Sequence, residues 1–402
     1  MREMKDSGVE WIGAIPVSWS TIKNKYIFRL RSGEAISKEA LIDEGLYPVY
    51  GGGERIGYYN KYNVSSNSFL IGRVGARCGC VTPVNSLCWA TDNALIAEID
   101  DMNDYYTYAL IAANLNRLNE SNAQPLITAT KVLNVSIPKP DKKEQLFIAE
   151  FLNNRSNECD TLIIDIQSQI ETLEEYKKSL VFRVVSKGLK KESLKTTTSD
   201  VWTSIPENWR LVDIKYVFEI VKRIAGQEGF DVLSVTQRGL KVKDVESNNG
   251  QQAESYAGYQ FVYPTDYVMN HMDLLTGWVD CSTMFGVTSP DYRVFRLRDK
   301  ENNDLTYFKY LMQCCYMSRI FYSLGQGVSN LGRWRLQTSA FNNFMIPVPP
   351  LEEQREIADY LDTKISEIDI IIADKQKQIE TIEEYKKSLI FEYVTGKKEV
   401  QA

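Results

Sequence analysis

The sequence is poor in the residues from which many active sites are built. Its 402 residues include a single histidine, His271, and seven cysteines. A Ser-His-Asp triad or a multi-histidine metal site would therefore depend on one residue. An odd number of cysteines, spread thinly over a long chain, is typical of reduced thiols and predicts a cytoplasmic protein.

Several other signatures are missing from the sequence. No apolar run approaches the roughly 18–20 residues that span a bilayer, and residues 1–6 lead into polar sequence without the apolar core of a secretory signal. We find no G-x-x-x-x-G-K-[ST] phosphate loop, no dinucleotide-binding G-x-G-x-x-G and no Asp/Asn-Pro-Pro-Tyr segment of amino-methyltransferases. These absences predict no membrane contact, no catalytic residues and no cofactor or metal in this chain.

The composition is that of a globular protein, with 44% hydrophobic and 25% charged residues. The net charge of −6 is unevenly distributed along the chain. Residues 1–140 and 201–350 are each neutral, and the excess of acid lies in residues 141–200 and 351–402. The acidic total therefore does not exclude a nucleic-acid partner for the neutral segments.

The chain contains an internal duplication. Three pairs of segments repeat in the same order: Ile15–Trp19 with Ile205–Trp209, Ile137–Pro140 with Ile346–Pro349, and Gln169–Leu180 with Gln378–Leu389. The last pair differs at one position only, Leu173 against Ile382. Between these anchors the halves look unrelated, and the second insert is longer. The pattern indicates two similar frames that hold different inserts.

The frames predict two long helices, over 142–185 and 351–394, because neither stretch contains proline or glycine. Asp141 and Glu144 resemble a capping box at the first helix. Apolar residues recur at a 3-4 spacing, which indicates a coiled-coil seam. An amphipathic helix packed on its own domain is the alternative. The residues that we expect in the seam or at a bound partner are Glu144, Gln145, Leu162, Ile166, Leu173, Tyr176 and Leu180, with Ile163 and Ile170 beside them, and Glu353, Gln354, Ile371, Ile382, Tyr385 and Leu389.

Lys375 takes the place of Ile166 in the second seam. A lysine there would fix the register or face another subunit.

The inserts predict mixed helix and strand domains. We expect strands at 68–72, 93–99, 267–270 and 293–297, and helices at 105–118 and 305–322. Glycine-rich turns such as Gly51–Gly53 separate these elements. The fold class is therefore α+β or α/β.

The inserts also carry basic and aromatic side chains around these turns. Arginine and glutamine pair with guanine and adenine edges, and lysine and tyrosine suit phosphates. Ordinary solvated surface is the alternative for each single residue. The DNA-binding candidates are Arg55, Tyr58, Tyr59, Lys61, Arg73, Arg77, Gln237, Arg238, Lys241, Lys243, Tyr292, Arg293, Arg333 and Arg335.

Two further sites have weaker support. Cys78, Cys80 and Cys88 could be imagined as zinc ligands, but their spacing is poor and no fourth ligand is evident. His271 could act as a general base, but the sequence offers no nucleophile beside it, which favours an ordinary histidine at a strand end.

The repeated I-P-x-x-W segment, the I-P-x-P-P-x-x-E-Q junction and the long helix resemble the specificity subunit of type I restriction–modification systems. The resemblance covers nearly the whole chain. Gly277–Val279 and Gly286–Tyr292 also resemble a segment of that family's target-recognition domains. One departure is the first junction, where Asp141-Lys142 stand in place of Pro350-Leu351. This difference predicts a different start for the first helix.

The resemblance implies two target-recognition domains, residues 1–140 and 201–350, separated by two long antiparallel helices in 141–200 and 351–402. It implies a coiled coil with a pseudo-twofold axis. Each domain would read one half of a bipartite, asymmetric site in double-stranded DNA. Two methyltransferase subunits would dock on the helices, and restriction/translocase subunits would complete an ATP-dependent endonuclease and adenine methyltransferase. S-adenosylmethionine, ATP and Mg²⁺ would then belong to those partners.

Antiparallel packing would match the symmetry of duplex DNA, with half-sites about 34 Å apart. Acidic helices should not lie along phosphates and are better suited to a protein partner. Two other classes stay open. One is an enzyme with nuclease or methyltransferase activity hidden in an insert. The other is a structural coiled-coil adaptor whose inserts bind proteins rather than DNA.

Overall fold

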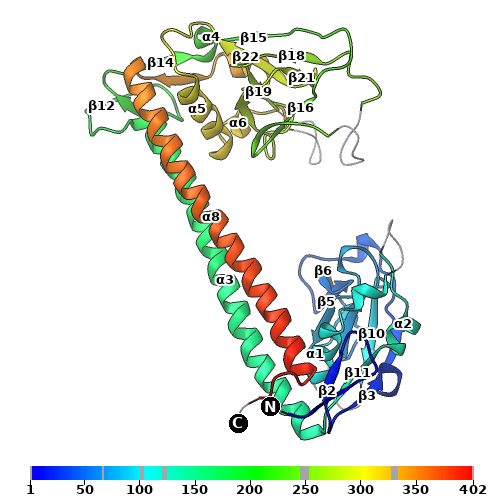
Figure 1. Cartoon of the computed structure of the whole chain (residues 1–402). Coiled ribbons are helices and arrows are strands. Elements are labelled where there is room, and N and C mark those ends of the chain that lie inside the picture. The colour runs from blue at the N-terminus through cyan, green and yellow to red at the C-terminus, as the bar shows by residue number, and fades with distance from the viewer. Residues whose placement is uncertain are drawn as a thin grey trace. The chain divides into compact units, whose positions relative to one another are not determined.

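A computed structural model of the chain describes residues 2–65, 68–99, 104–119, 125–244, 253–326 and 334–400. The chain forms two compact units (Figure 1). Unit 1 comprises Met1–Gln167 and Gln376–Ala402, and unit 2 comprises Ser168–Lys375. The two long helices α3 (Lys142–Lys187) and α8 (Leu351–Val394) each contribute one part to each unit.

Unit 1 contains a four-stranded antiparallel sheet and three smaller strand groups. The four strands lie in the order β4 (Arg29–Ser32), β10 (Ala94–Glu98), β7 (Ser68–Gly72) and β8 (Val81–Val84). The smaller groups are β1 (Met4–Asp6) with β2 (Ala14–Pro16), β3 (Ser20–Lys23) with β11 (Ser136–Lys139), and β6 (Glu54–Tyr59), β5 (Tyr47–Gly51) and β9 (Trp89–Ala90). Helices α1 (Asp104–Ala112) and α2 (Ala129–Asn134) and the 3-10 turns η1 (Asn24–Tyr26), η2 (Lys38–Ala40), η3 (Gly75–Arg77) and η4 (Leu115–Leu118) complete the unit.

Unit 2 repeats this arrangement. Its four-stranded antiparallel sheet has the order β15 (Phe218–Val221), β22 (Arg293–Leu297), β19 (Tyr267–Met269) and β20 (Val279–Cys281). The pairs β12 (Leu194–Thr196) with β13 (Ser204–Pro206) and β14 (Arg210–Asp213) with β23 (Met345–Val348) match the outer pairs of unit 1. The remaining elements are β16 (Leu233–Thr236), β17 (Gly239–Val242), β18 (Gln260–Val262), β21 (Gly286–Thr288), α4 (Ile214–Val217), α5 (Leu305–Met317), α6 (Ile320–Ser323) and α7 (Thr338–Asn342).

The duplication therefore extends into the inserts, which the sequence anchors do not reveal. The predicted strands at 68–72 and 293–297 and the helix at 351–394 have the expected bounds, and the predicted insert helices are each interrupted once. Between the named strands of the described residues, every pairing is antiparallel except that of β5 with β9. Segregated helices with antiparallel sheets make the fold class α+β.

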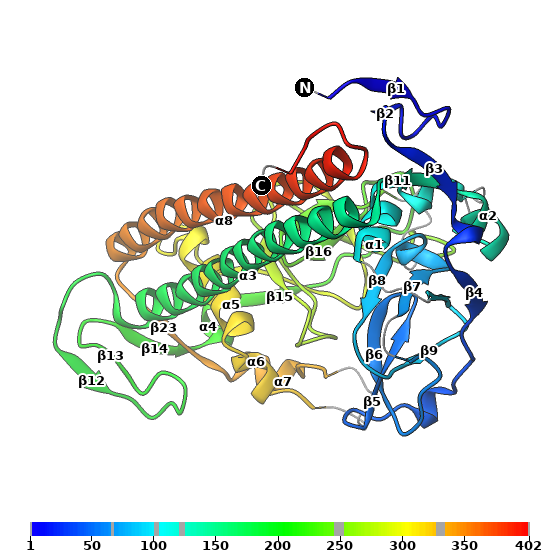
Figure 2. The same ribbon diagram turned by 90° about the horizontal axis from the view of Figure 1, so that it is seen from below.

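Helices α3 and α8 run side by side in opposite directions within each unit (Figures 1 and 2). In unit 1, Lys386 Nζ donates to Asp160 Oδ1 at 2.7 Å. In unit 2, Lys177 Nζ donates to Asp369 Oδ1 at 2.6 Å. Lys177 lies nearer the end of α3 than Asp160, whereas its partner Asp369 lies nearer the start of α8 than Lys386. The two contacts therefore fit helices that run in opposite directions. The two pairs are equivalent under the sequence repeat, so the same contact is made once in each unit.

The seam between the helices has a phase that differs in part from the predicted one. Leu162, Tyr176, Ile371 and Tyr385 are 52%, 54%, 44% and 55% exposed, so placing them in the seam is wrong. In each case the next residue along the helix lies in the seam. The seam positions are Cys159, Ile163, Ile166, Ile170, Leu173, Lys177 and Leu180 in α3, and Ile368, Ile372, Lys375, Ile379, Ile382, Lys386 and Leu389 in α8.

Lysine explains the shift, because its methylene stem can fill a seam position while its ammonium reaches a carboxylate on the other helix. Lys177 and Lys386 do this in the contacts just described. Lys375 makes a similar contact with an amide in place of the carboxylate, since its Nζ donates to Gln169 Oε1 at 2.5 Å within unit 2. Of the two roles predicted for Lys375, this contact fits the fixing of register.

All seven cysteines are free thiols. Across the described ranges, no group of three or more His, Cys, Asp or Glu side chains could hold a metal ion. Cys78, Cys80 and Cys88 are not brought together as such a group. In the part of the chain that the structure covers, no helix is both long and apolar enough to cross a membrane.

Candidate nucleic-acid interface

The repeated Glu-Gln pair anchors each helix to the start of its own unit. Trp19 Nε1 donates to Glu144 Oε2 at 2.7 Å, and Trp209 Nε1 donates to Glu353 Oε2 at 2.9 Å. Both tryptophan side chains are buried. Each I-P-x-x-W segment is therefore held by the glutamate of the distant junction.

The glutamines of these pairs donate hydrogen bonds to the carbonyl oxygens of the junction prolines. Gln145 Nε2 donates to Pro140 O and Gln354 Nε2 donates to Pro349 O, both at 2.9 Å. Gln145 and Gln354 are buried, as is Glu353. For these three residues, burial contradicts the prediction that they bind a partner subunit, whereas Glu144 is half-buried. They fix the angle at which each strand leads into its long helix.

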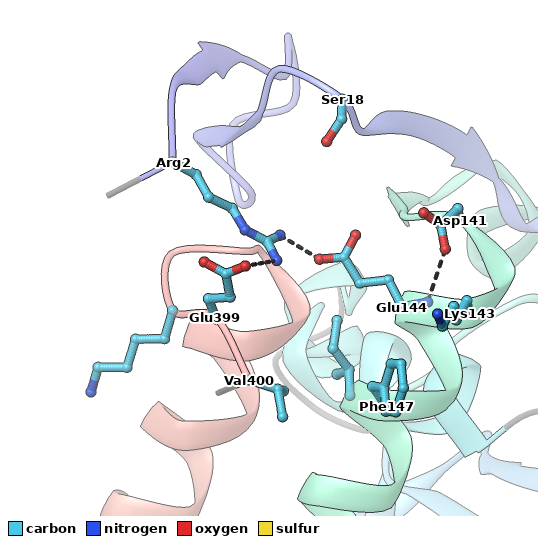
Figure 3. A pocket seen from close by; sticks show the side chains of 10 residues that line it. Arg2, Ser18, Asp141, Lys143, Glu144, Phe147, Glu399 and Val400 are labelled. Carbon is cyan, nitrogen blue, oxygen red and sulfur yellow. Dashed lines mark hydrogen bonds and ion pairs between the residues drawn. The ribbon is translucent and has the colours of Figure 1, made fainter. Parts of the chain in front are cut away.

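A cavity of about 380 Å³ lies at this junction in unit 1 (Figure 3). Arg2 crosses it, contacting Glu144 Oε1 and donating to Glu399 Oε1 at 2.9 Å. Asp141 Oδ1 accepts a hydrogen bond from Glu144 N at 2.9 Å, so Asp141 caps α3 as expected. The Glu144 carboxylate binds Trp19 and Arg2, away from the reciprocal capping contact. Despite the different junctions, α3 and α8 begin at equivalent residues, so the expected difference in start is wrong.

A tyrosine pair that the sequence reading missed fixes each insert on its frame. Tyr105 OH donates to Pro138 O at 3.1 Å, and Tyr307 OH donates to Pro347 O at 3.0 Å. Three residues later, Tyr108 OH and Tyr310 OH each donate to a side chain of the adjacent long helix. The signal was present as a Tyr-x-x-Tyr pattern near the start of the main helix of both inserts.

In unit 1 two glycine-rich loops meet and bring basic side chains together. A Cβ atom on Gly72 would lie 2.0 Å from Arg77 O and 2.7 Å from Gly52 O, so only glycine fits between the loops. Arg77 Nη2 lies 3.5 Å from Glu54 Oε1, and Arg55 Nη1 donates to Tyr58 OH at 2.9 Å. Arg55, Lys61 and Arg77 are exposed, while Tyr58, Tyr59 and Arg73 are half-buried.

In unit 2 a hairpin presents a second basic group. Gln237 and Arg238 are exposed at the turn between β16 and β17, and Lys241 is exposed on β17. Leu240 N donates to Asp280 Oδ2 at 2.9 Å, which fixes this hairpin on β20. Lys243 and Tyr292 are half-buried, and Arg335 is exposed. Arg333 lies outside the described residues.

Arg293 does not fit the prediction of direct DNA contact. It is 4% exposed, and its Nη2 donates to Leu336 O at 3.1 Å. Its guanidinium also lies 4.6 Å from the centre of the Phe341 ring. Burial lowers the pKa of Arg293 to about 10. A guanidinium enclosed by protein in this way supports its neighbours and does not touch DNA.

His271 lies two residues after the end of β19, and its carbonyl oxygen accepts a hydrogen bond from Leu336 N at 3.0 Å. Burial first, and then the charges of Arg293 and Arg335, lower the pKa of His271 to about 4. The imidazole is therefore neutral at physiological pH. A base with so low a pKa is poorly matched to proton abstraction near neutrality, which favours the strand-end interpretation over a general base.

The frame is duplicated, and the two units carry different sets of basic loops. This arrangement is typical of a recognition protein with two reading units. The model of the type I restriction modification DNA specificity domain matches residues 16–172 and 244–381. The Type I restriction enzyme MjaVIII specificity subunit of Methanocaldococcus jannaschii is 26% identical over 320 residues, which are 74% of this chain and 70% of that protein. The EcoprrI specificity subunit of Escherichia coli is 30% identical over 133 residues, covering 32% of this chain and 33% of that protein.

A solved structure described for complex assembly and conformational transition of the type I R-M system has a TM-score of 0.62 to this chain. It is 12% identical, and the match covers 94% of this chain and 98% of the other. At this identity the likeness concerns the fold alone. Because the family model matches more than half of its residues, the chain belongs to the type I restriction–modification specificity family. Its role is that of a DNA sequence-specificity subunit, and the adaptor alternative is not favoured.

Proposed function

We propose that the chain reads a bipartite, asymmetric site in double-stranded DNA. Residues 1–140 read one half-site and residues 201–350 read the other. The observation that carries this proposal is the contrast between frame and loops. The Trp–Glu, Gln–Pro and Tyr–Pro contacts are made twice with the same geometry, whereas the exposed basic residues differ between the units.

The helices in 141–200 and 351–402 set the spacing between the half-sites and bind two methyltransferase subunits. The exposed apolar residues of the helices support this part of the proposal. Leu162 and Tyr385 belong to unit 1, and their equivalents Ile371 and Tyr176 belong to unit 2. Each unit thus presents one copy of the same apolar pair on an acidic helix surface, which fits one partner subunit per unit.

Catalysis resides in the partners and not in this chain. Methyltransferase subunits supply S-adenosylmethionine chemistry, and restriction/translocase subunits use ATP and Mg²⁺. The assembled complex then acts as a DNA adenine methyltransferase or as an ATP-dependent endonuclease, in the cytoplasm. The chain itself contributes recognition and the arrangement of the other subunits.

Comparing the methylomes of cells with and without this chain tests the proposal. We expect a split consensus, with two short defined parts and a gap of fixed length, that disappears with the chain. If the same methylated motifs are found with and without the chain, the result would support a protein-binding adaptor. Methyl transfer or cleavage by the purified chain alone would instead support an enzyme hidden in an insert.

A further inference from the structure

Arg73 and His271 occupy equivalent positions in the two units. Strands β7 and β19 hold the same place in the two four-stranded sheets. Gly72 N donates to Cys80 O, and its counterpart Asn270 N donates to Trp278 O, both at 2.9 Å. Arg73 and His271 follow these residues directly.

Equivalent chain segments pass next to Arg73 and His271 in the two units. Ile127 N donates to Arg73 O at 2.9 Å, and Leu336 N donates to His271 O at 3.0 Å. Ile127 and Leu336 are themselves equivalent under the repeat, and both are buried. The carbonyl groups of Arg73 and His271 are therefore held alike, although Arg73 N donates to Asn93 O and His271 N donates to Met269 O. The side chains differ completely.

The neighbouring strand also differs between the units at the position next to this site. In unit 1, Ile71 pairs with Leu95 on β10, and in unit 2, Met269 pairs with Arg293 on β22. Arg293 thus stands where unit 1 has a leucine that is 2% exposed. A charge in a core position is unfavourable unless an opposite charge or full hydrogen bonding compensates it.

Arg293 is compensated only in part. Besides Leu336 O, its Nη2 reaches Thr338 Oγ1 at 3.3 Å. Within the described residues, Arg293 Nη1 and His271 Nδ1 are both buried without a hydrogen-bond partner, and no carboxylate forms an ion pair with Arg293. An apolar residue would serve packing better here. We therefore assign Arg293 a role at His271: through its hydrogen bond to Leu336 O it fixes the Arg335–Leu336 segment against His271.

We propose that this position is a base-reading position in each unit, occupied by Arg73 in unit 1 and His271 in unit 2, with Arg293 as the positioning residue of His271. The inference rests on the proposed function and assigns residues to it. Arginine can donate two hydrogen bonds to the O6 and N7 atoms of guanine. A neutral imidazole offers one donor and one acceptor, which suits a single atom on a base edge. One scaffold position with two side chains would give the two half-sites different bases.

The test maps methylated sites in cells in which variants of the full chain replace the natural one, together with its partner subunits. His271→Gln and Arg293→Leu should each relax the same single position of the second half-site. Arg73→Gln should relax one position of the first half-site. A base contact of this kind typically gives discrimination on the order of tenfold or more, which these variants should lose. Arg296→Gln is the matched control, because Arg296 is exposed on the same strand as Arg293.

A second readout separates positioning from folding. His271 is the only histidine, so its NMR titration is unambiguous. Of the two arginine charges that lower the pKa of His271, that of Arg293 has the larger effect, and Arg293→Leu removes it. The pKa of His271 should therefore rise from about 4 toward the ordinary value of 6.5, while burial and Arg335 still hold it partly down. Folded Arg293→Leu protein with an unchanged titration would remove the positioning role.

The outcomes distinguish the inference from the function on which it rests. If natural chain gives a split consensus but the His271 and Arg73 variants leave both half-sites unchanged, the inference alone is wrong. Equal weakening at all sequences would make these residues phosphate contacts and also overturns it. Absence of any consensus with the natural chain would instead contradict the proposed function.

Discussion

Single polar residues in this protein have two distinct tasks, and burial separates them. Gln145, Glu353 and Gln354 are buried and, with the half-buried Glu144, serve the frame. By contrast, Arg55, Arg77 and Arg238 are exposed. Repetition in the sequence identified the Glu-Gln pairs correctly as special but could not say why. A repeated residue can be kept for an internal contact or for a partner, and only the fold tells these apart.

Glu353 offers a direct test of the frame contact. Glu353→Ala leaves the buried Trp209 indole N–H without its acceptor, so we expect a loss of about 1–3 kcal/mol in the free energy of unfolding. Urea unfolding followed by tryptophan fluorescence measures it. Glu352→Ala is the control, because Glu352 lies in the same first turn of α8 but is exposed. Equal losses in both variants would reduce the role of Glu353 to an effect on the helix terminus.

His271 makes the stability depend on pH. Its pKa is about 4 in the folded chain, and its ordinary value is 6.5. Below pH 6.5 the unfolded chain therefore binds a proton that the folded chain refuses, so this contribution to stability is complete above pH 6.5 and is lost as the pH falls toward 4. We expect His271→Gln to flatten the rise of the urea midpoint between pH 4 and 6.5. Parallel curves for the two proteins would contradict the low pKa.

At the scale of elements, the helices were the most predictable part of the fold. Two long stretches without proline or glycine became α3 and α8. The phase of the seam was less predictable, because Lys177 and Lys386 occupy it with their stems while the apolar Tyr176 and Tyr385 beside them face outward. Hydrophobicity alone selects the tyrosine in each pair. Only the position of the acidic partner on the other helix selects the lysine.

Adjacent residues of α3 test this phase. Ile163 lies in the seam, and Leu162 next to it is 52% exposed. Ile163→Asp places an unpaired carboxylate against the apolar residues of α8, and we expect a loss of about 2–3 kcal/mol in the free energy of unfolding. Leu162→Asp should change it by less than about 0.5 kcal/mol. Thermal or urea unfolding of both variants decides the matter, and the reverse order of effects would restore the phase that the sequence suggested.

At the scale of the whole molecule, the sequence revealed the duplication but underestimated its extent. The inserts looked unrelated, yet both contain a four-stranded antiparallel sheet with the same strand order. Strand pairing depends on the alternation of buried positions more than on residue identity, so equivalent sheets can lose all visible similarity. The DNA-facing candidates were harder still. Arg293 reads as a surface arginine in the sequence, and only the pairing of β19 with β22 places it inside the fold.

The duplication leads to a prediction about independence. Each unit carries its own core, its own frame contacts and its own basic loops, so a change in one unit should leave the other half-site untouched. We expect Arg77→Gln to alter only the first half-site and Arg335→Gln only the second. Residues without shared partners contribute additively to within about 0.3–0.5 kcal/mol, so the double variant should show the sum of the two losses.

Binding of the assembled complex to duplexes that vary in one half-site at a time measures both losses and their sum. A lost base contact costs about 1–3 kcal/mol at one position, whereas a lost phosphate contact weakens all duplexes alike and reduces the salt dependence. Lys23→Gln, at an exposed position of β3 outside the basic loops of unit 1, serves as the control. If Arg335→Gln changed the preferences at both half-sites equally, the two units would not be independent readers. A non-additive double variant would likewise mean that one unit senses what the other has bound.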